Sequence, residues 1–403
     1  MPHAKTIAII GAGPSGLMAA EILAGAGHRV TIFDRMPSPA RKFLIAGRGG
    51  LNLTHSEPLD AFIARYGAAA DWLAPAIRNF RPEQLRSWCE GLGVETFVGS
   101  SGRVFPRSMK AVPLVRAWLK RLEQLGVQYA PRHRWLGWAG DALCFEDATH
   151  ATLHVQADAT LLALGGASWP RLGSDGTWAT ILAAEGVSVA PLRPANCGFT
   201  TLWTPYLRER FQGQPLKPVT ITHDGVARQG EAMITEHRIE GGVIYALSSA
   251  RQQAIARHGS TIIHLDLRPT MTHAALSEKL RSRANKSLPS FLRSNGFSPL
   301  AIALLHELTP PATLKAAHAE TLAAQLKALP LLLTGIGHIA RAISTAGGIM
   351  QHEVTDDFML RKKPGVFVAG EMLDWEAPTG GYLLQACFST AATAARGMHT
   401  WKN

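Results

Sequence analysis

The start of the chain shows apolar runs separated by glycines, a pattern that predicts a strand–helix–strand unit. Residues 6–10 read TIAII, which is typical of a buried parallel strand. A glycine-rich turn over 11–16 follows, and residues 17–26 have a helix-forming composition. A second apolar run, 29–33, ends at Asp34. We therefore expect a βαβ unit with a right-handed crossover.

The rest of the chain divides into helical and strand-like stretches. Composition predicts helices over 59–125 and 272–329, and a strand-rich stretch over 191–267 in which Asp224–Gly225 marks a hairpin turn. Short alternating runs predict a β-meander over 135–155. Further apolar runs predict strands at 158–164, 344–349 and 365–370, and a final helix over 382–398.

Signals of a parallel sheet thus occupy both ends of the chain, with a mixed region between them. The simplest architecture is an α/β fold in which one Rossmann-like nucleotide-binding domain is interrupted by an insertion. We expect that domain to cover 1–190 and 345–403. The insertion then has a strand-rich part, 191–270 with 331–344, and a helical part, 271–330.

Composition fits a globular protein in a reducing compartment. Hydrophobic residues make up 46% of the chain and charged residues 18%. The apolar stretch 6–27 is broken by glycines and Pro14, so we expect neither a signal peptide nor a membrane span there. The four cysteines form no C-x-x-C pair, which argues against a dithiol or a cysteine zinc site. We expect a cytoplasmic protein without a metal or a membrane partner.

The net charge of +11 is unevenly distributed. Between Arg78 and Arg134 there are 11 Lys or Arg against 4 Glu and no Asp. Such a face attracts nucleic acid or an anionic ligand, but charge runs are more often solvated helix faces. No nucleic-acid-binding motif accompanies this one.

The turn after the first strand has the G-x-G-x-x-G spacing of a dinucleotide site. Gly11 allows the tight turn, Gly13 lets a pyrophosphate approach the backbone, and Gly16 lets helix and strand pack closely. The helix N-terminus offers free N–H groups to phosphates. Asp34, at the end of the second strand, is placed to accept hydrogen bonds from a ribose. The motif alone does not distinguish NAD from FAD.

Later segments resemble those of FAD-binding, glutathione-reductase-like flavoproteins with two dinucleotide folds. They are 158–166, which ends in two glycines, and 365–371, which ends in Gly370–Glu371. The resemblance implies that Glu371 meets the ribityl chain. It also implies that the last helix, opened by Gly380–Gly381–Tyr382, points its positive end at the flavin pyrimidine edge.

The chain as a whole resembles the aminoacetone oxidase-like and BaiN-like family of FAD-binding flavoproteins (NAD(P)/FAD-dependent oxidoreductases). The matching segments lie in the family's order at 41–55, 102–106, 165–170 with 173–176, 347–349, and 370–374 with 380–385. The resemblance implies non-covalent FAD, a FAD domain built from both chain ends, and an insertion with a β-barrel-like and a helical part. Many members read Gly-Arg-Cys-Asn-Leu-Thr where this chain has GGLNLT at 49–54. Arg48 is close enough to replace the missing arginine.

These arguments give a set of expected cofactor contacts. The loop from Ala46 to His55 is expected to wrap the pyrophosphate through Arg48 and to reach the ring edge through Asn52 and Thr54. The full set is Gly11, Gly13, Pro14, Ser15, Gly16, Asp34, Arg35, Lys42, Gly47, Arg48, Asn52, Thr54, Gly165, Gly166, Gly370, Glu371, Gly380, Gly381, Tyr382 and Leu383.

A second dinucleotide motif is only apparent. Residues 335–340 read GIGHIA, but no βαβ pattern surrounds them, so we expect no built-in nicotinamide domain. NAD(P)H would then be a transient donor at the flavin. Alternatively, the substrate itself is the reductant and oxygen the acceptor.

The catalytic acid or base is not fixed by any motif. His55, His237 and Tyr382 are weak candidates, with Glu231, Tyr245 and Glu376 behind them. No Ser-His-Asp order, HExxH motif or P-loop lysine is present.

The leading function is an FAD-dependent oxidoreductase that transfers hydride between FAD and a small organic substrate or NAD(P)H. The alternative is a flavin-dependent RNA-associated or nucleic-acid-modifying protein, suggested by the basic segment. A non-catalytic flavin-binding regulator is the third possibility.

Overall fold

The computed structural model describes residues 4–46, 49–283 and 286–402. The chain forms two compact units, the first from residues 1–193 and 344–403 and the second from residues 194–343. Each unit has its own hydrophobic core. The two ends of the chain therefore build one unit together, and its middle part folds separately.

A five-stranded sheet forms the centre of the first unit, with strand order β20-β10-β1-β2-β6 and parallel neighbours throughout. In its register Ile9 lies between Ile32 and Leu161, and all three side chains are buried. Such apolar runs suit strands covered on both faces. The strands are β1 (Thr6–Ile10), β2 (Arg29–Asp34), β6 (Gln128–Pro131), β10 (Ala159–Leu162) and β20 (Val366–Val368).

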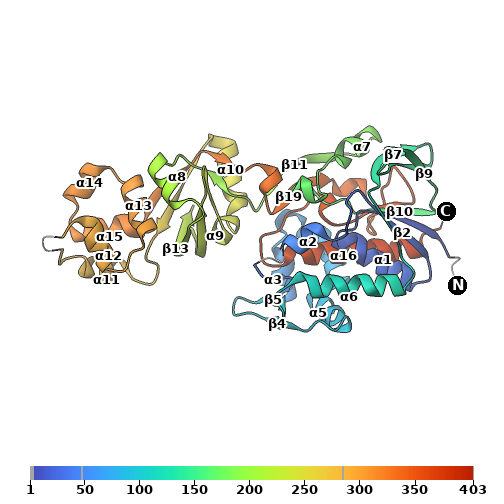
Figure 1. The fold of residues 1–403 in the computed structure, drawn as a ribbon, viewed down its shortest axis with the longest axis horizontal. Coiled ribbons are helices and arrows are strands. Elements are labelled where there is room, and N and C mark those ends of the chain that lie inside the picture. Colours follow the sequence, from blue (N-terminus) through green and yellow to red (C-terminus); the bar gives the residue numbers. More distant parts are fainter. Residues whose placement is uncertain (1–3, 47–48, 284–285, 403) are drawn as a thin grey trace. The chain divides into compact units, whose positions relative to one another are not determined.

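Helix α1 (Pro14–Gly25) follows β1 directly, as the strand–helix–strand pattern predicts. The last helix, α16 (Tyr382–Thr400), packs against α1, so the two chain ends share one helical layer (Figure 1). The remaining helices of the unit are α2 (Arg41–Ala46), α3 (Leu59–Ala64), α4 (Ala70–Asn79), α5 (Pro82–Gly91), α6 (Ala111–Gln124) and α7 (Trp178–Ala184).

Three small sheets complete the first unit. The predicted meander is confirmed as β7 (Arg134–Ala139), β8 (Ala142–Glu146) and β9 (Thr152–Val155), which pair antiparallel. A second sheet has the order β3-β5-β4, with β3 (Thr54–His55), β4 (Thr96–Val98) and β5 (Arg103–Pro106). The stretch 59–125 is mostly helical, as predicted, but it also contains β4 and β5, which are strands because they pair with each other and with β3. In the third, β11 (Val189–Ala195) pairs with β19 (Ser344–Ile349).

The second unit contains a seven-stranded sheet of order β17-β16-β13-β14-β15-β12-β18. Asp224 and Gly225 form the predicted two-residue turn between β13 and β14, both with positive φ. The outermost strands, β17 and β18, follow one another in the chain, so the sheet must curve round on itself. The strands are β12 (Phe199–Thr200), β13 (Pro215–His223), β14 (Val226–Ile234), β15 (Arg238–Glu240), β16 (Thr261–Asp266), β17 (Leu329–Leu333) and β18 (Gly335–Ile336).

Helices of the second unit lie both within its strand-rich part and after it. The predicted helical stretch is confirmed, and three further helices, α8, α9 and α10, interrupt the strands. They are α8 (Pro205–Phe211), α9 (Gly242–Tyr245), α10 (Ser248–His258), α11 (His273–Lys279), α12 (Leu288–Ser294), α13 (Pro299–Leu308), α14 (Pro311–Ala316) and α15 (Ala319–Lys327). Short 3-10 helices of the chain are η1 (Gly67–Ala69), η2 (Pro170–Leu172), η3 (Ile339–Arg341), η4 (Gln351–Glu353) and η5 (Gly370–Met372).

Across the described ranges, no helix is both long and apolar enough to cross a membrane. The same residues contain no group of three or more His, Cys, Asp or Glu side chains placed to hold a metal ion. All four cysteines are free thiols.

Candidate functional site

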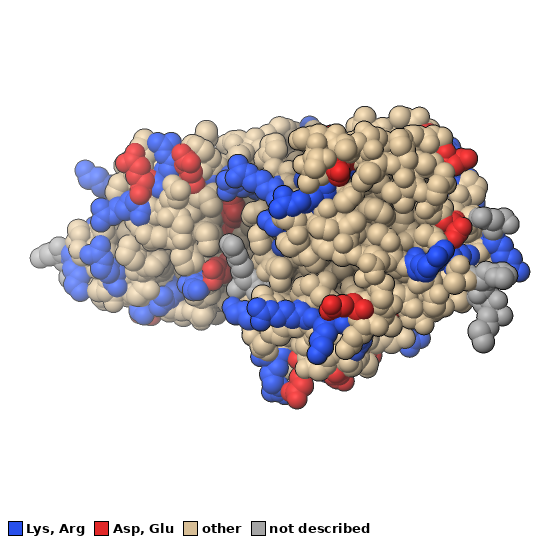
Figure 2. Space-filling model, turned by 45° about the vertical axis from the view of Figure 1, so that its right-hand side comes forward, with Lys and Arg blue, Asp and Glu red and all other residues tan. Residues whose placement is uncertain are grey.

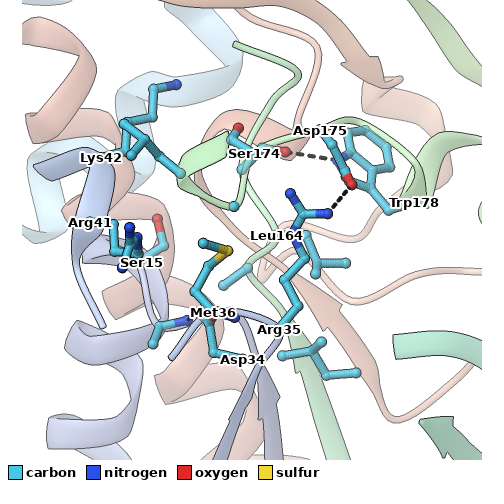
Figure 3. A pocket seen from close by; sticks show the side chains of 18 of the residues that line it. Ser15, Asp34, Arg35, Met36, Arg41, Lys42, Leu164, Ser174, Asp175 and Trp178 are labelled. Atoms are coloured by element: carbon cyan, nitrogen blue, oxygen red, sulfur yellow. Dashed lines mark hydrogen bonds and ion pairs between the residues drawn. The ribbon is translucent and has the colours of Figure 1, made fainter. Parts of the chain in front are cut away.

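A pocket opens in the first unit where β1, β2 and β10 end (Figure 3). Its walls come from segments far apart in the sequence: the turn 11–15, the end of β2 at 33–36, helix α2, and residues 163–165 and 172–178. The carboxyl ends of parallel strands are where such sheets bind nucleotides. The position of the pocket therefore follows from the strand order.

The three glycines of the first turn differ in what surrounds them. A Cβ on Gly11 would lie 2.3 Å from the Ala163 carbonyl oxygen, and one on Gly16 would lie 1.9 Å from the Gly11 carbonyl oxygen. Gly13 has nothing within 4 Å of its Cβ position, and it lines the pocket. Gly11 and Gly16 thus allow close backbone packing, whereas Gly13 leaves space for a ligand.

Asp34 ties the end of β2 to the same turn. Its carboxylate accepts hydrogen bonds from the amides of Ala12, at 2.6 Å, and Met36, at 2.7 Å. Burial raises the pKa of Asp34 above its usual value, although these two hydrogen bonds act in the opposite direction. The oxygens keep lone pairs for a further donor such as a ribose hydroxyl.

Several hydrogen-bond donors in the pocket have no partner among the described residues. They are Nε of Arg35, Nε of Arg41 and Oγ of Ser174. Arg35 also forms an ion pair with Asp175 and donates to the Pro170 carbonyl, so its side chain is held across one side of the pocket (Figure 3). Helix α1 adds the first-turn amides of Ser15 and Gly16, which lack intrahelical acceptors. Unpaired donors around open space fit an anionic ligand such as a pyrophosphate.

A buried carboxylate, Glu371, also lines the pocket and pairs with Lys42. Glu371 accepts hydrogen bonds from Lys42 Nζ at 2.9 Å, the Thr345 amide at 2.8 Å and the Gly166 amide at 3.3 Å. Lys42 also donates to Ser168 Oγ at 2.6 Å. The segments 165–168 and 370–371, which resemble FAD signatures, are thereby joined to helix α2.

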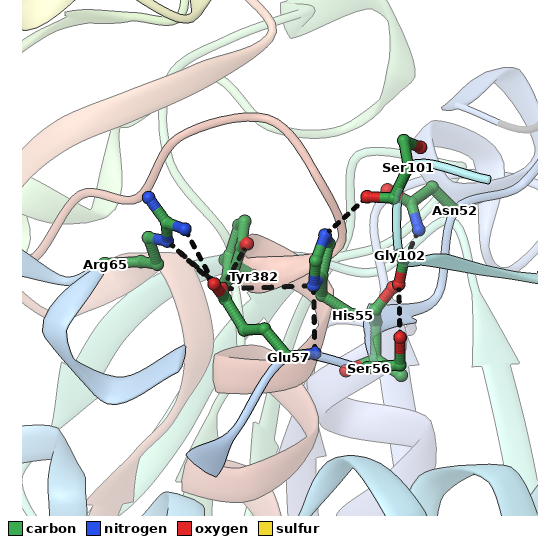
Figure 4. Close-up of polar contacts among 9 residues, drawn as sticks. Asn52, His55, Ser56, Glu57, Arg65, Ser101, Gly102 and Tyr382 are labelled. Carbon is green, nitrogen blue, oxygen red and sulfur yellow. Dashed lines mark hydrogen bonds and ion pairs between the residues drawn. The ribbon is translucent and has the colours of Figure 1, made fainter. Parts of the chain in front are cut away.

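A second polar cluster surrounds the start of α16 (Figure 4). A Cβ on Gly381 would meet the Thr54 backbone at 2.5 Å, so β3 lies directly against this helix start. The rings of His55 and Tyr382 stack, with their centroids 5.5 Å apart. Tyr382 donates to Glu57, whose carboxylate is also held by Nε and Nη2 of Arg65. The cluster fixes the first turn of α16 to the loop after β3.

The hydrogen bonds of this cluster limit its acid–base chemistry. Nδ1 of His55 accepts from the Glu57 amide and Nε2 donates to the Ser101 carbonyl, so neither nitrogen is free. Burial, together with Glu57, raises the pKa of Tyr382 well above its usual value. Burial opposes ionisation of Glu57, but the hydrogen bonds from Arg65 and Tyr382 outweigh it and lower the Glu57 pKa. Both weak candidates, His55 and Tyr382, are therefore placed in this cluster with their polar atoms occupied.

The expected cofactor contacts fall into two groups. Nine line the pocket: Gly11, Gly13, Pro14, Ser15, Asp34, Arg35, Lys42, Gly165 and Glu371. The others lie beside it or around the start of α16: Gly16, Asn52, Thr54, Gly166, Gly370, Gly380, Gly381, Tyr382 and Leu383. Both donors of Asn52 are committed to the carbonyls of Thr54 and Val104, while the buried Oγ1 of Thr54 has no partner among the described residues. Gly47 and Arg48 lie outside the described residues.

Several candidate acid–base residues lie in the second unit. His237 is exposed beside Glu236, at 3.4 Å, and Glu231 pairs with Lys217 at 3.0 Å. The Tyr245 hydroxyl donates to Glu240 at 3.5 Å. Glu376, in the first unit, is half-buried.

The apparent second dinucleotide motif does not form a strand–helix unit. Residues 335–336 are the short strand β18, which pairs antiparallel with β12 and leads into the 3-10 helix η3.

Comparison with known proteins identifies the chain. The family described as the HI0933-like protein Rossmann domain matches residues 5–397. The chain belongs to this family. It is 25% identical over 406 residues to the 3-dehydro-bile acid delta(4,6)-reductase of Clostridium scindens, covering 97% of this chain and 98% of that protein. It is also 25% identical over 402 residues to the ribosomal RNA dihydrouridine synthase of Escherichia coli, covering 97% of both.

Solved structures agree on the fold of this HI0933-like protein. A 3-ketosteroid-delta4-(5alpha)-dehydrogenase from Rhodococcus jostii gives a TM-score of 0.52 at 14% identity, covering 100% of this chain and 98% of that one. A 3-ketosteroid delta1-dehydrogenase from Sterolibacterium denitrificans gives 0.53 at 11% identity, covering 99% and 100%. The predicted Rossmann-like α/β fold is confirmed. As a member of this FAD-binding family, the chain is an FAD-dependent oxidoreductase.

Sequence reasoning missed some residues that shape the site. Ser168 and Asp175 lie inside segments that carry the family resemblance. The sequence therefore pointed to these segments, but not to the contacts of Ser168 with Lys42 and of Asp175 with Arg35. Glu57, Arg65 and Thr345 carry no motif. Their contacts are with residues far away in the sequence, and only the fold brings them together.

Proposed function

We propose that this HI0933-like protein uses FAD to transfer hydride from NAD(P)H to a carbon–carbon double bond conjugated with a carbonyl group in a small organic substrate. The names of its relatives support this chemistry. One is a delta(4,6)-reductase of a 3-dehydro-bile acid and the other forms dihydrouridine, so both add hydrogen to such a double bond. The shared element is the reaction at the double bond, not the substrate.

The observation that carries the proposal is the pocket at the ends of β1 and β2. Bound there, FAD supplies a carrier of hydride. The turn at Gly13 and the first amides of α1 would bind its pyrophosphate, and Asp34 its ribose. Lys42 would hold Glu371 in place toward the ribityl chain. The unpaired Nε of Arg41 and Oγ of Ser174 offer further donors.

We assign NAD(P)H the part of a transient donor. In the described part of the chain, the βα unit at 6–25 is the site with a dinucleotide-binding turn, and 335–340 forms no such unit. A nicotinamide cofactor would therefore dock only while it reduces the flavin.

RNA is a second candidate substrate because one relative acts on ribosomal RNA. Within 78–134, Arg103, Lys110, Arg116 and Lys120 are exposed. Other basic residues of this segment pair with carboxylates, such as Arg78 with Asp60 and Arg107 with Glu95. Figure 2 shows both Lys or Arg and Asp or Glu side chains on the visible face. Small molecules are therefore the better supported class.

The test follows the visible absorbance of the flavin without oxygen. We expect NADPH or NADH to bleach the bound flavin, and a cyclic enone to restore its colour faster than a uridine-containing ribosomal RNA fragment does. Restoration by RNA alone, with strong salt dependence, would favour the second candidate. A protein that contains no flavin and refuses added FAD would contradict both.

A further inference from the structure

The second unit buries an arginine that has no anionic partner. Arg251, in helix α10, has 0% exposed surface. Its Nη1 donates to the Ile244 carbonyl at 2.9 Å, and its guanidinium lies 5.8 Å from the ring centroid of Phe199. Its Nε and Nη2 have no hydrogen-bond partner among the described residues. None of the ion pairs of the described chain includes this side chain.

The two free nitrogens are the ones that bind a carboxylate. Nε and Nη2 lie on the same edge of a guanidinium and point their hydrogens in parallel, which matches the two oxygens of a carboxylate. The first unit shows this edge in use. Arg65 donates through Nε and Nη2 to the carboxylate of Glu57, at 3.1 and 2.6 Å. Arg251 presents the same pair of donors, and neither has a hydrogen-bond partner among the described residues.

Unpaired donors on a buried, charged guanidinium are energetically unfavourable. Removing a charge from water without pairing it is costly, and native proteins satisfy nearly all buried donors. Burial lowers the pKa of Arg251 to about 10, so the side chain still carries its charge at neutral pH. The Nε and Nη2 donors of this buried charge are therefore open to a partner from outside the described residues.

The surroundings define the charge of that anion. The charge of Arg251 affects the pKa of His223. Burial is the main reason that its pKa lies below the usual value, and Arg251 lowers it further, against the effect of Asp224. His223 therefore remains neutral at neutral pH and adds no positive charge to that of Arg251. One charge balances a carboxylate but not a phosphate dianion. A phosphodiester within RNA is also a monoanion, but the RNA chain continues on both sides of it. A guanidinium that is fully buried cannot accommodate that chain.

We propose that Arg251 is the binding site for the carboxylate group of a small organic acid, held by both oxygens on the free Nε–Nη2 edge. The proposal goes beyond the oxidoreductase function, because it assigns a ligand group to the second unit and requires no flavin chemistry. It stands even if the double-bond reduction is wrong.

The test measures thermal unfolding of the flavin-loaded full chain with small probes that can enter a buried site. We expect about 100 mM acetate or formate to raise the Tm by about 2 °C relative to chloride at equal ionic strength, whereas acetamide does not. In Arg251→Met the acetate increment disappears. The Tm of this variant in chloride stays the same or rises, because an unpaired buried charge has been replaced by an apolar side chain.

Two further variants keep the result interpretable. Arg257→Met removes an exposed arginine from the same helix and should retain the acetate increment. Arg251→Lys keeps the charge but lacks the paired donors, so it should lose most of the increment even if Arg251→Met folds poorly. A wild-type protein that does not distinguish acetate from chloride would overturn the proposal. So would an increment that survives in both Arg251 variants, or one that phosphate reproduces in full.

Discussion

Lys42 balances the charge of a buried carboxylate in the pocket. Its ammonium group is the cation that faces the buried carboxylate of Glu371, and the two backbone amides on that carboxylate carry no full charge. The Glu371 side chain is only 7% exposed, so water screens this pair weakly. Losing Lys42 would leave a nearly buried negative charge in the pocket that we propose for the pyrophosphate.

We expect Lys42→Met to lower the free energy of unfolding of the FAD-free protein by about 2 kcal/mol. It should also weaken FAD binding, because the remaining charge on Glu371 repels the phosphates. Urea unfolding and fluorescence titration with FAD measure the two effects. The double variant Lys42→Met/Glu371→Gln should recover part of the stability, since no unpaired charge remains. Lys120→Met, on the exposed face of α6, is the control, and equal losses in both single variants would refute the argument.

Two glycines in the turn between β1 and α1 have different functions: one allows close backbone packing and the other leaves space for a ligand. Gly16 is required by the fold, because the Gly11 carbonyl occupies the place of its Cβ. Gly13 has an ordinary backbone, with φ of −82°, and free space around its Cβ position. The same substitution should therefore have opposite consequences at the two positions.

Gly13→Ala is expected to leave the Tm of the FAD-free protein nearly unchanged and to weaken FAD binding at least about tenfold, because its methyl group fills the space for the pyrophosphate. Gly16→Ala should instead lower the Tm strongly or prevent folding, because its Cβ would overlap a backbone atom. Thermal unfolding and FAD titration of both variants measure the two effects. Equal FAD affinity of Gly13→Ala and the wild type would show that the ligand does not approach this residue.

The sequence indicates some parts of the fold much better than others. The strands β1, β10 and β20 and the helix α16 were predictable, because buried parallel strands are continuous apolar runs and glycines mark their ends. β4 and β5 were not, because they are short and owe their conformation to pairing with β3. The contact of Glu57 with Tyr382 joins residues 325 positions apart, a distance at which no local pattern operates.

The first unit is closed by contacts between the two ends of the chain. His28 is buried, and its Nδ1 accepts a hydrogen bond from the Lys5 amide, so Nε2 carries the proton that faces Nδ1 of His399 at 2.9 Å. The Lys5 ammonium donates to the Met398 carbonyl at 2.7 Å. These contacts attach the end of α16 to the residues that directly precede β1 and β2. The cofactor pocket at the other end of those strands depends on the same layer remaining in place.

This junction should make stability depend on pH. Burial lowers the pKa of His28 below its usual value, and the nearby His399 and Lys5 lower it further. Above about pH 6.5 His28 is neutral in the folded and the unfolded chain alike. As the pH falls below that value, the unfolded chain takes up a proton that the folded chain refuses. The free energy of unfolding therefore decreases until the pH reaches the lower pKa of the folded state.

We expect a loss of about 1 kcal/mol from this group between pH 7.5 and pH 5.5, measured by urea unfolding at each pH. His28→Gln keeps a donor toward His399 but does not titrate, so its stability should fall less over the same range. His258→Gln removes an exposed histidine at the end of α10 and should leave the wild-type slope unchanged. If His28→Gln and the wild type lose stability in parallel, the slope has another origin and the junction of the chain ends is not pH-sensitive.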